Sequence, residues 1–364
     1  MLVHNRPMRT LWPTDDGGVA IIDQTRLPHA VEVVQLRTLE QAASAISDMQ
    51  VRGAPLIGAT AAWGLALALQ QDASDKGLRR AVRTLGATRP TAVNLAWALA
   101  RVENRVRLLR PERRAAAARE EAAALVDEDV AACRAIGEAG AEIICDLAKA
   151  WPGRPINILT HCNAGWLAAI DWGTALAPIY VAQERGIPMH VWVDETRPRN
   201  QGASLTAFEL GHQGIPHTII VDNAGGHLMQ HGQVDMCLVG ADRITRTGDA
   251  ANKIGTYLKA LAARDNAVAF YVAAPSSTID WSINDGVKQI PIEQRSAREV
   301  THISGALTGG QIAEIAITAP GSPAANYAFD VTPARLITGL ITERGLCAAS
   351  ASELLRLFPE QVAT

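Results

Sequence analysis

A cysteine and an aspartate each follow a short apolar segment in the second half of the chain. Cys162 comes after residues 156–160, and Asp242 comes after residues 234–239, within Gly240-Ala241-Asp242-Arg243. Such segments favour buried strands, and ligands of open α/β sheets bind outside the carboxyl ends of the strands. We therefore expect Cys162 and Asp242 at one rim of a sheet, where a thiol and a carboxyl group can transfer protons.

The sequence after Asp242 adds an amide and a cation to this rim. Asn252 and Lys253 precede Gly255 and a segment of helical periodicity at 257–263. Glycine allows a backbone to approach a ligand closely. The N–H groups of a helix start and the charge of Lys253 suit an anion. We expect this stretch to bind a small polar molecule that carries a phosphate.

Besides the Asp242 loop, four polar loops follow strand-like segments of the second half, and the loop that contains Cys162 is one of them. They begin at His161, Asp194, Asp222 and Pro275, and the second of them contains Gln201. The carboxyl ends of parallel strands share one rim of a sheet. The five loops together therefore predict a composite pocket for a small molecule.

Each candidate also has a purely structural explanation. Cys162 can be an unreactive core residue, because cysteine is among the most buried residue types. Asp242 can be a helix N-cap. Arg52 precedes Gly53 at a helix break, which suits phosphate binding by a helix N-terminus, although a surface arginine is the commoner case. Spacing alone leaves both explanations open for each residue.

An α/β architecture in the second half would position these loops. Strand-like and helix-like segments alternate there at a spacing of about 25 to 30 residues, which indicates βαβ units and a parallel sheet. Residues 1–150 are mainly helical, with a small β element at 18–35, and a Pro- and Gly-rich stretch at 151–155 marks the change. We predict an N-terminal domain at 1–150 and a catalytic domain at 151–364, with a last helix at 334–342.

Composition and charge exclude several classes of function. The net charge of −3 does not favour nucleic acid or an anionic membrane as a partner. No apolar run reaches the ~20 residues of a transmembrane helix, and the N-terminus lacks the apolar segment of a signal peptide. The 5 cysteines are scattered without a CxxC pair, so neither a zinc site nor a disulfide framework is expected. We expect a soluble, cytoplasmic protein without a metal.

Several stretches together resemble the signature motifs of the methylthioribose-1-phosphate isomerases. They are Arg52-Gly53-Ala54-Pro55, Thr160-His161-Cys162-Asn163-Ala164-Gly165, Asp194-Glu195-Thr196-Arg197-Pro198, Gly240-Ala241-Asp242-Arg243, Gly248-Asp249-x-x-Asn252-Lys253-Ile254-Gly255-Thr256 and Ala328-Phe329-Asp330-Val331-Thr332-Pro333. By this resemblance Cys162 and Asp242 are the catalytic pair. The positions that match substrate-binding residues are Arg52, Gly53, Ala54, Arg89, Gln201, Asn252 and Lys253.

The resemblance implies an aldose–ketose isomerisation of 5-methylthioribose 1-phosphate in methionine salvage. It also implies a Rossmann-like C-terminal domain, a homodimer and no cofactor. Asp242 would protonate the ring oxygen as the ring opens. Cys162 would either take the C2 proton as a thiolate or polarise the C2 hydroxyl during a direct hydride shift, and the sequence leaves both open.

Departures from the family pattern leave the 5-substituent open. Trp166 and Ser204 stand where other residues are usual, and both are expected close to the pocket. One alternative is the same chemistry on 5-deoxyribose 1-phosphate or ribose 1,5-bisphosphate. Another is a non-catalytic subunit like the regulatory subunits of the translation-initiation guanine-exchange factor. A dehydrogenase is disfavoured, because no GxGxxG motif follows a strand.

Overall fold

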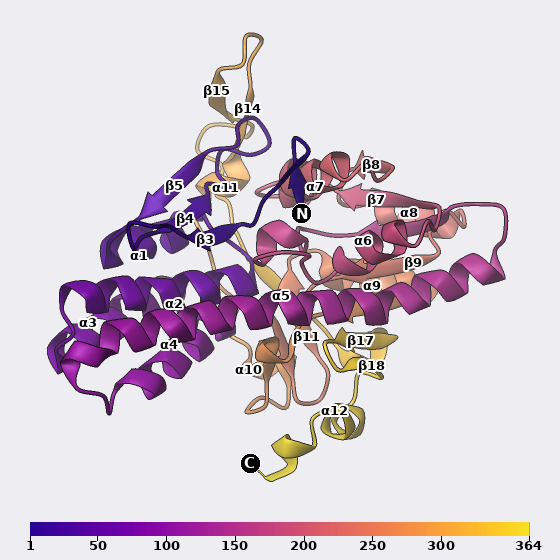
Figure 1. Cartoon of the computed structure of the whole chain (residues 1–364). Coiled ribbons are helices and arrows are strands. Elements are labelled where there is room, and N and C mark those ends of the chain that lie inside the picture. Colours follow the sequence, from indigo (N-terminus) through magenta and orange to yellow (C-terminus); the bar gives the residue numbers. More distant parts are fainter. Residues whose placement is uncertain (364) are drawn as a thin grey trace.

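A seven-stranded sheet forms the centre of the second half of the chain (Figure 1). The structure is a computed structural model that describes residues 1–363. Within these residues the strand order is β18-β17-β12-β9-β6-β7-β8, and only β18 runs antiparallel to its neighbour. The strands are β6 (Ile156–Thr160), β7 (Met189–Asp194), β8 (His217–Ile220), β9 (Met236–Val239), β12 (Ala269–Ala273), β17 (Gly339–Thr342) and β18 (Gly345–Cys347). The predicted α/β fold with a mostly parallel sheet is confirmed.

The strand order places a topological switch point between β6 and β9. From β6 the chain builds outward through β7 and β8, and it then returns to the other side of β6 with β9, β12 and β17. Ligands of such sheets bind in the crevice outside the carboxyl ends at the switch point. Cys162 follows β6 and Asp242 follows β9, so the sheet puts both residues beside this crevice.

Side chains of the central strands pack into two cores on opposite faces of the sheet. In β6, Ile158 belongs to the core that includes α5 (Pro111–Ala150) and α6 (Ala177–Glu184). Its neighbour Leu159 belongs to the core that includes α8 (Ala224–Gln230) and α9 (Thr256–Asp265). Burial on both faces explains why consecutive residues of β6, such as Ile158 and Leu159, are both apolar.

The first half of the chain is built around α2 (Ala54–Gln71). Every residue of α2 from 56 to 69 is buried, as expected for a helix that is apolar all round. The surrounding helices are α1 (Leu39–Ser47), α3 (Asp75–Gly86), α4 (Val93–Val106) and the first part of α5. An antiparallel sheet of β3 (Leu11–Pro13), β4 (Val19–Ile22) and β5 (Val33–Leu36) completes this part.

Helix α5 belongs to both halves of the molecule. Its 40 residues correspond to a length of about 60 Å. Leu125 and Val126 lie in the core around α2, whereas Ile136 and Ile144 lie in the core against the sheet. Figure 1 shows the helix running along both parts. The division into domains at 150/151 falls directly after this helix and stays a prediction.

The predicted final helix at 334–342 is wrong. Ala334–Leu336 form a single 3₁₀ turn, and Gly339–Thr342 form strand β17 within the large sheet. Periodicity alone does not distinguish a short buried strand from a buried helix. Gly339 disfavours a helix, and in β17 it packs against Tyr271 of the neighbouring strand.

A second sheet follows Asp242 and was not predicted. β10 (Arg243–Thr245) and β11 (Ala250–Lys253) form an antiparallel hairpin between β13 (Ile279–Asp280) and β16 (Phe329–Thr332). Asn252 and Lys253 therefore lie on a strand, not in a loop. Lys253 pairs with Phe329, a residue far away in the sequence, so no local pattern announced this sheet.

The remaining elements lie at the margins of these parts. They are β1 (Leu2–Val3), β2 (Arg6–Pro7), α7 (Ala207–His212), α10 (Gly286–Gln289), α11 (Arg298–Thr301), β14 (His302–Ala306), β15 (Ile312–Ala316) and α12 (Ala351–Leu357). The hairpin of β14 and β15 projects from the rest of the molecule (Figure 1). Between residues 1 and 363, no helix combines the length and the apolar character that a membrane span requires.

Candidate active site

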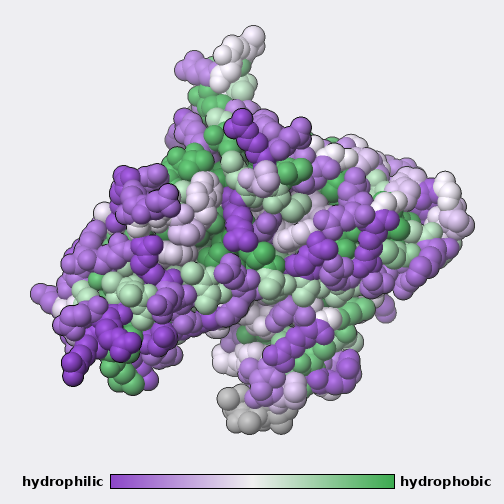
Figure 2. Space-filling view, viewed as in Figure 1, coloured by the Kyte–Doolittle hydropathy of each residue, from purple (hydrophilic) through white to green (hydrophobic). Residues whose placement is uncertain are grey.

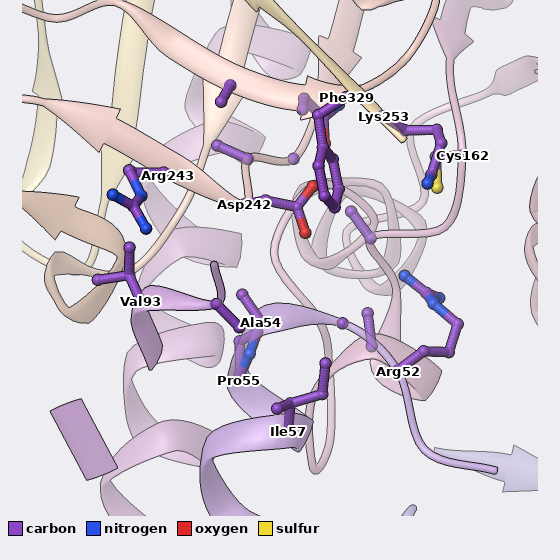
Figure 3. Close-up of a pocket in the computed structure, with 18 of the residues that line it drawn as sticks. Arg52, Ala54, Pro55, Ile57, Val93, Cys162, Asp242, Arg243, Lys253 and Phe329 are labelled. Atoms are coloured by element: carbon purple, nitrogen blue, oxygen red, sulfur yellow. The ribbon is translucent and has the colours of Figure 1, made fainter. Parts of the chain in front are cut away.

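One cavity at the switch point is lined by all nine residues that were predicted for the site (Figure 3). Cys162 and Asp242 contribute from the ends of β6 and β9. The others are Arg52, Gly53, Ala54, Arg89, Gln201, Asn252 and Lys253. The cavity lies between the N-terminus of α2 and the rim of the large sheet, so both halves of the chain form its walls. The structure thus brings the predicted residues together, and their roles stay predictions.

The N-terminus of α2 forms one wall of the cavity. Gly53 precedes the helix with a φ of 93°, and a Cβ at this position would lie 2.4 Å from the carbonyl oxygen of Ala168. Ala54 and Pro55 begin the helix, which agrees with the preference of proline for the first turn. No described side chain caps this helix start, so its N–H groups are available to an anion.

Arg52 is held beside this helix start by Asn163. Its Nη2 donates to the main-chain oxygen of Asn163 at 2.7 Å, and its Nη1 donates to Asn163 Oδ1. The guanidinium group is buried, and no carboxylate among residues 1–363 forms an ion pair with it. A buried charge without a counter-charge is costly, so the site favours an anionic ligand here.

Lys253 brings a second buried cation to the cavity. Its Nζ lies 4.7 Å from the centre of the Phe329 ring. Burial lowers the pKa of Lys253, whereas Cys162 and Asp242 raise it. Two buried cations in one cavity suit a doubly charged group such as phosphate.

Cys162 occupies an unusual turn after β6. Its φ is 64°, a value that few residues other than glycine adopt. Its N–H donates to Thr196 Oγ1 at 2.8 Å, and its carbonyl oxygen accepts from Thr206 Oγ1 at 2.6 Å. Burial raises the pKa of the Cys162 thiol, and Arg52 and Lys253 act in the opposite direction. The raised pKa favours the thiol form at neutral pH, and two threonines hold the backbone of Cys162 in place.

Asp242 stands between β9 and β10. Its N–H donates to the carbonyl oxygen of Ala251 at 2.8 Å, which fixes the backbone against β11. Figure 3 shows its carboxyl group beside Phe329 in the middle of the cavity. Burial raises the pKa of Asp242, while Lys253 and two arginines lower it. A carboxyl group with a raised pKa keeps its proton to a higher pH and suits a general acid.

Arg89 differs from the other two cations, because a carboxylate balances its charge. Its Nε and Nη2 donate to Glu293 Oε2 at 3.1 and 2.8 Å. Spacing gave no reason to choose Arg89, and Glu293 was not predicted at all. Gln201 is also buried, and its Oε1 has no hydrogen-bond partner among the described residues. That oxygen is free to accept a hydrogen bond from a ligand hydroxyl.

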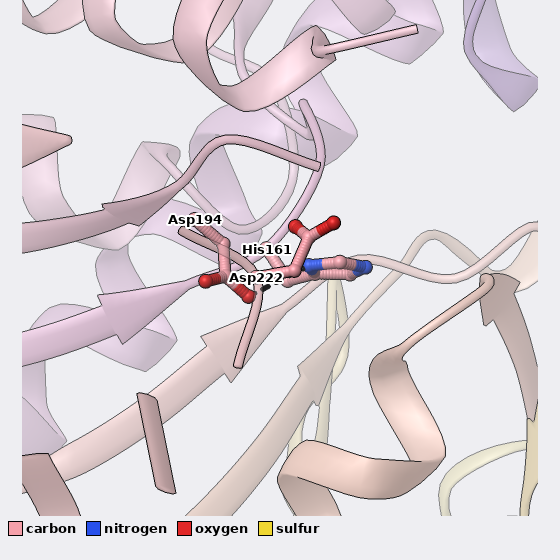
Figure 4. A group of neighbouring side chains, drawn as sticks. All are labelled: His161, Asp194 and Asp222. Carbon is pink, nitrogen blue, oxygen red and sulfur yellow. Dashed lines mark hydrogen bonds and ion pairs between the residues drawn. The ribbon is translucent and has the colours of Figure 1, made fainter. Parts of the chain in front are cut away.

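A cluster of metal-ligand type lies next to the cavity (Figure 4). Ligand atoms of His161, Asp194 and Asp222 lie within 4.8 Å of one another. The Lys259 ammonium forms an ion pair with Asp194 and donates to the carbonyl oxygen of Asp222 at 3.0 Å. The Asp222 carboxylate accepts two backbone N–H groups of the neighbouring loop, at 2.7 and 2.8 Å. Lys259 thus supplies a positive charge beside the two aspartates. The contacts of the cluster connect the ends of β6, β7 and β8 without requiring a metal.

Two residues that were expected close to the pocket do not line the cavity itself. The Trp166 side chain is fully buried in the core against the sheet, and Ser204 lines a neighbouring cavity. The cavity has instead an apolar lining that sequence reasoning missed, formed by Met49, Ile57, Ile290, Pro291 and Phe329. Apolar residues this far apart in the sequence carry no signal for a ligand site.

The fold and the cavity define a class of protein, a Rossmann-like α/β protein with a cavity at its switch point that is lined by buried cations. The sequence profile of the initiation factor 2 subunit family matches residues 50–349. Methylthioribose-1-phosphate isomerase of Methylorubrum extorquens is 63% identical over 362 residues, which are 99% of each chain. The protein of that name from Paramagnetospirillum magneticum is 64% identical over 362 residues, 99% of this chain and 100% of the other.

Solved structures agree with these relatives. 5-Methylthioribose 1-phosphate isomerase from Pyrococcus horikoshii OT3 has a TM-score of 0.83 at 40% identity, over 98% of this chain and 97% of that one. Translation initiation factor eIF-2B, subunit delta, from A. fulgidus has a TM-score of 0.79 at 38% identity, over 97% and 100%. The chain belongs to the initiation factor 2 subunit family, and within it to the methylthioribose-1-phosphate isomerases.

Proposed function

We propose that this protein isomerises 5-methylthioribose 1-phosphate to 5-methylthioribulose 1-phosphate in methionine salvage. The observation that carries the proposal is one cavity in which Cys162 and Asp242 accompany two buried cations, Arg52 and Lys253. Relatives named for this activity match the full length of the chain at 63 and 64% identity, which supports the same substrate.

The phosphate is proposed to bind between the start of α2 and the side chains of Arg52 and Lys253. The N–H groups of the helix and the two cations complement its charge. Gln201 and Asn252 then face the sugar, and the unpartnered Oε1 of Gln201 accepts from a hydroxyl. The apolar lining around Phe329 suits the methylthio group.

Asp242 is proposed to act as the general acid that opens the sugar ring. The phosphate on C1 prevents the ring from opening as a free aldose does, so the ring oxygen needs a proton as its bond to C1 breaks. Burial raises the pKa of Asp242, which keeps this proton available. The carboxylate that forms is then stabilised by Lys253 and Arg52, which lower the pKa of Asp242.

The hydrogen on C2 is proposed to move to C1 as a hydride. C2 is oxidised to the ketone, C1 is reduced to a methylene group, and the proton of the C2 hydroxyl returns to Asp242. Burial raises the pKa of Cys162, so the thiolate that could act as a base is scarce at neutral pH. Cys162 then orients the C2 hydroxyl. The redox change is internal to the substrate, so the reaction consumes no external oxidant.

A homodimer in the cytoplasm is proposed as the working form. Ile312, Ile315 and Ile317, on and beside the projecting hairpin, are exposed, and Figure 2 shows hydrophobic surface at its base. Exposed apolar surface of this kind favours a protein contact. The cysteines are free thiols, which suits a reducing compartment. Light scattering of the purified protein, with an expected mass of two chains, tests the dimer.

The function is tested by measuring isomerase turnover on three sugar phosphates in parallel. They are 5-methylthioribose 1-phosphate, 5-deoxyribose 1-phosphate and ribose 1,5-bisphosphate, with the Asp242→Asn variant as a control for contaminating enzymes. We expect kcat/KM to be highest for the first. Preference for one of the other two substrates would agree with the proposed isomerisation but would contradict a role in methionine salvage. A folded protein that turns over none of them would favour a non-catalytic regulatory subunit.

A further inference from the structure

A buried glutamate outside the cavity binds the loop that follows Cys162. The Glu209 side chain, on α7, is completely buried and does not line the cavity. Its Oε1 accepts from Asn163 Nδ2 at 2.8 Å and from Leu167 N at 3.0 Å. Its Oε2 accepts from Trp166 N at 2.9 Å and from Tyr180 Oη at 2.7 Å.

These contacts require that both oxygens of Glu209 can accept a hydrogen bond. The backbone N–H groups of Trp166 and Leu167 can only donate, and each faces a different oxygen, so a carboxyl group satisfies both and an amide does not. The fit is close, because a Cβ at Gly165 would lie 1.8 Å from Glu209 Oε2. Residues 163–167 are therefore wrapped around the carboxylate, and their position depends on it.

Glu209 also determines which way the Asn163 amide points. The Nδ2 group of Asn163 faces Glu209 and Thr206, so Oδ1 points in the opposite direction, toward Arg52. A reversed amide would place an NH₂ group against the guanidinium and oxygen against the carboxylate. Glu209 Oε1, the acceptor for Nδ2, thereby favours the orientation in which Asn163 can bind Arg52.

We infer that Glu209 is a positioning residue that holds Arg52 for the substrate phosphate through Asn163. Arg52 receives two contacts from Asn163, one to Oδ1 and one to the main-chain oxygen, and both acceptors move with the loop that Glu209 binds. Two bonds fix the plane of a guanidinium, and a planar fork is what bidentate binding of phosphate requires. The inference rests on the proposed function, since it assigns Arg52 to the substrate phosphate.

The test is a Glu209→Gln variant, compared with Tyr180→Phe. Whichever way the new amide points, its NH₂ group faces the N–H of Trp166 or of Leu167, so the loop must shift. Tyr180→Phe removes the hydroxyl that donates to the same carboxylate. Unlike Glu209→Gln, it does not place two N–H donors against each other. We expect KM for 5-methylthioribose 1-phosphate to rise roughly 10- to 100-fold in Glu209→Gln, with a smaller change of kcat, and to stay within about threefold in Tyr180→Phe.

A double-mutant cycle shows whether the effect passes through Arg52. In an Arg52→Lys background the two-bond contact with Asn163 is already lost, so Glu209→Gln should change KM by less than about threefold. An unchanged KM in the single variant, or a full effect in the Arg52→Lys background, would overturn the inference. If Glu209→Gln does not fold, Asn163→Ala takes its place with the same expectations. A wild-type protein without turnover would instead reject the proposed function.

Discussion

Replacing Asp242 by asparagine is the sharpest perturbation of the proposed reaction. The two side chains have nearly the same shape, and the backbone contact of residue 242 with Ala251 does not involve the side chain. The variant therefore keeps the geometry of the cavity and removes only the acidic proton. The phosphate-binding groups, Arg52, Lys253 and the start of α2, remain in place.

The expected loss of kcat in Asp242→Asn can be estimated from the proposed role of Asp242 as a general acid. General acid catalysis by a positioned side chain contributes about 10²- to 10⁴-fold to the rate, which corresponds to roughly 3–5.5 kcal/mol of activation free energy. We expect kcat to fall within this range while KM changes little. Burial raises the pKa of Asp242, so its ionised form is less favourable in the folded than in the unfolded state. A neutral asparagine avoids this cost, and the variant should be at least as stable as the wild type at pH 7.

Three measurements on the same protein preparation test this reasoning. Initial rates give kcat and KM, thermal unfolding gives the stability, and the pH dependence of kcat/KM gives the ionisation of the acid. The wild-type profile should fall on its alkaline side, because Asp242 must hold its proton in the free enzyme. If Asp242→Asn retains more than about a tenth of the wild-type kcat, the general-acid assignment is refuted. A variant that loses activity because it unfolds would refute the stability argument.

Three further outcomes are expected. Substrate that carries deuterium at C2 should yield product with deuterium retained at C1 by mass spectrometry, whereas exchange with water would require a base and reject the hydride shift. Gly53→Ala should lower the free energy of unfolding by about 2 kcal/mol or more in urea titrations. Residue 53 has a positive φ, and the new Cβ would clash with the backbone of Ala168. A variant as stable as the wild type would contradict the close contact between Gly53 and Ala168. Arg89→Met should reduce kcat/KM more than the double variant Arg89→Met/Glu293→Gln. The single change leaves Glu293 Oε2 without the guanidinium that it faces, although Oε1 still pairs with Arg295. Equal losses would show that Arg89 and Glu293 do not act together.

The parts of the site that follow strands were predictable from the sequence. Cys162 and Asp242 come after apolar runs, and a parallel sheet places the ends of such runs at one rim. Their side-by-side position needs one further fact, that β6 and β9 are neighbours, which the order of strands along the chain does not give. Arg52 was indicated by the helix break before α2, since a helix start is a local signal.

Residues that reach the site through distant pairing could not be predicted in this way. Phe329 lines the cavity because β16 pairs with β11, and Glu293 reaches Arg89 from a segment without regular periodicity. Glu209 is a charged residue inside an apolar helix, which by itself indicates a surface position. Only the four donors that surround it explain its burial, and they come from two other segments, the loop 163–167 and helix α6.

Helix α5 couples the stability of the two halves of the molecule, because its residues belong to both cores. Leu125 of this helix packs in one core and Ile136 packs in the other. Unfolding of the middle of the helix would therefore disrupt both cores at once. Heating should therefore melt the chain in a single cooperative transition. A fragment that ends at residue 150 would leave the stripe of Ile136 and Ile144 facing water, and it would aggregate. The two walls of the cavity should therefore unfold together.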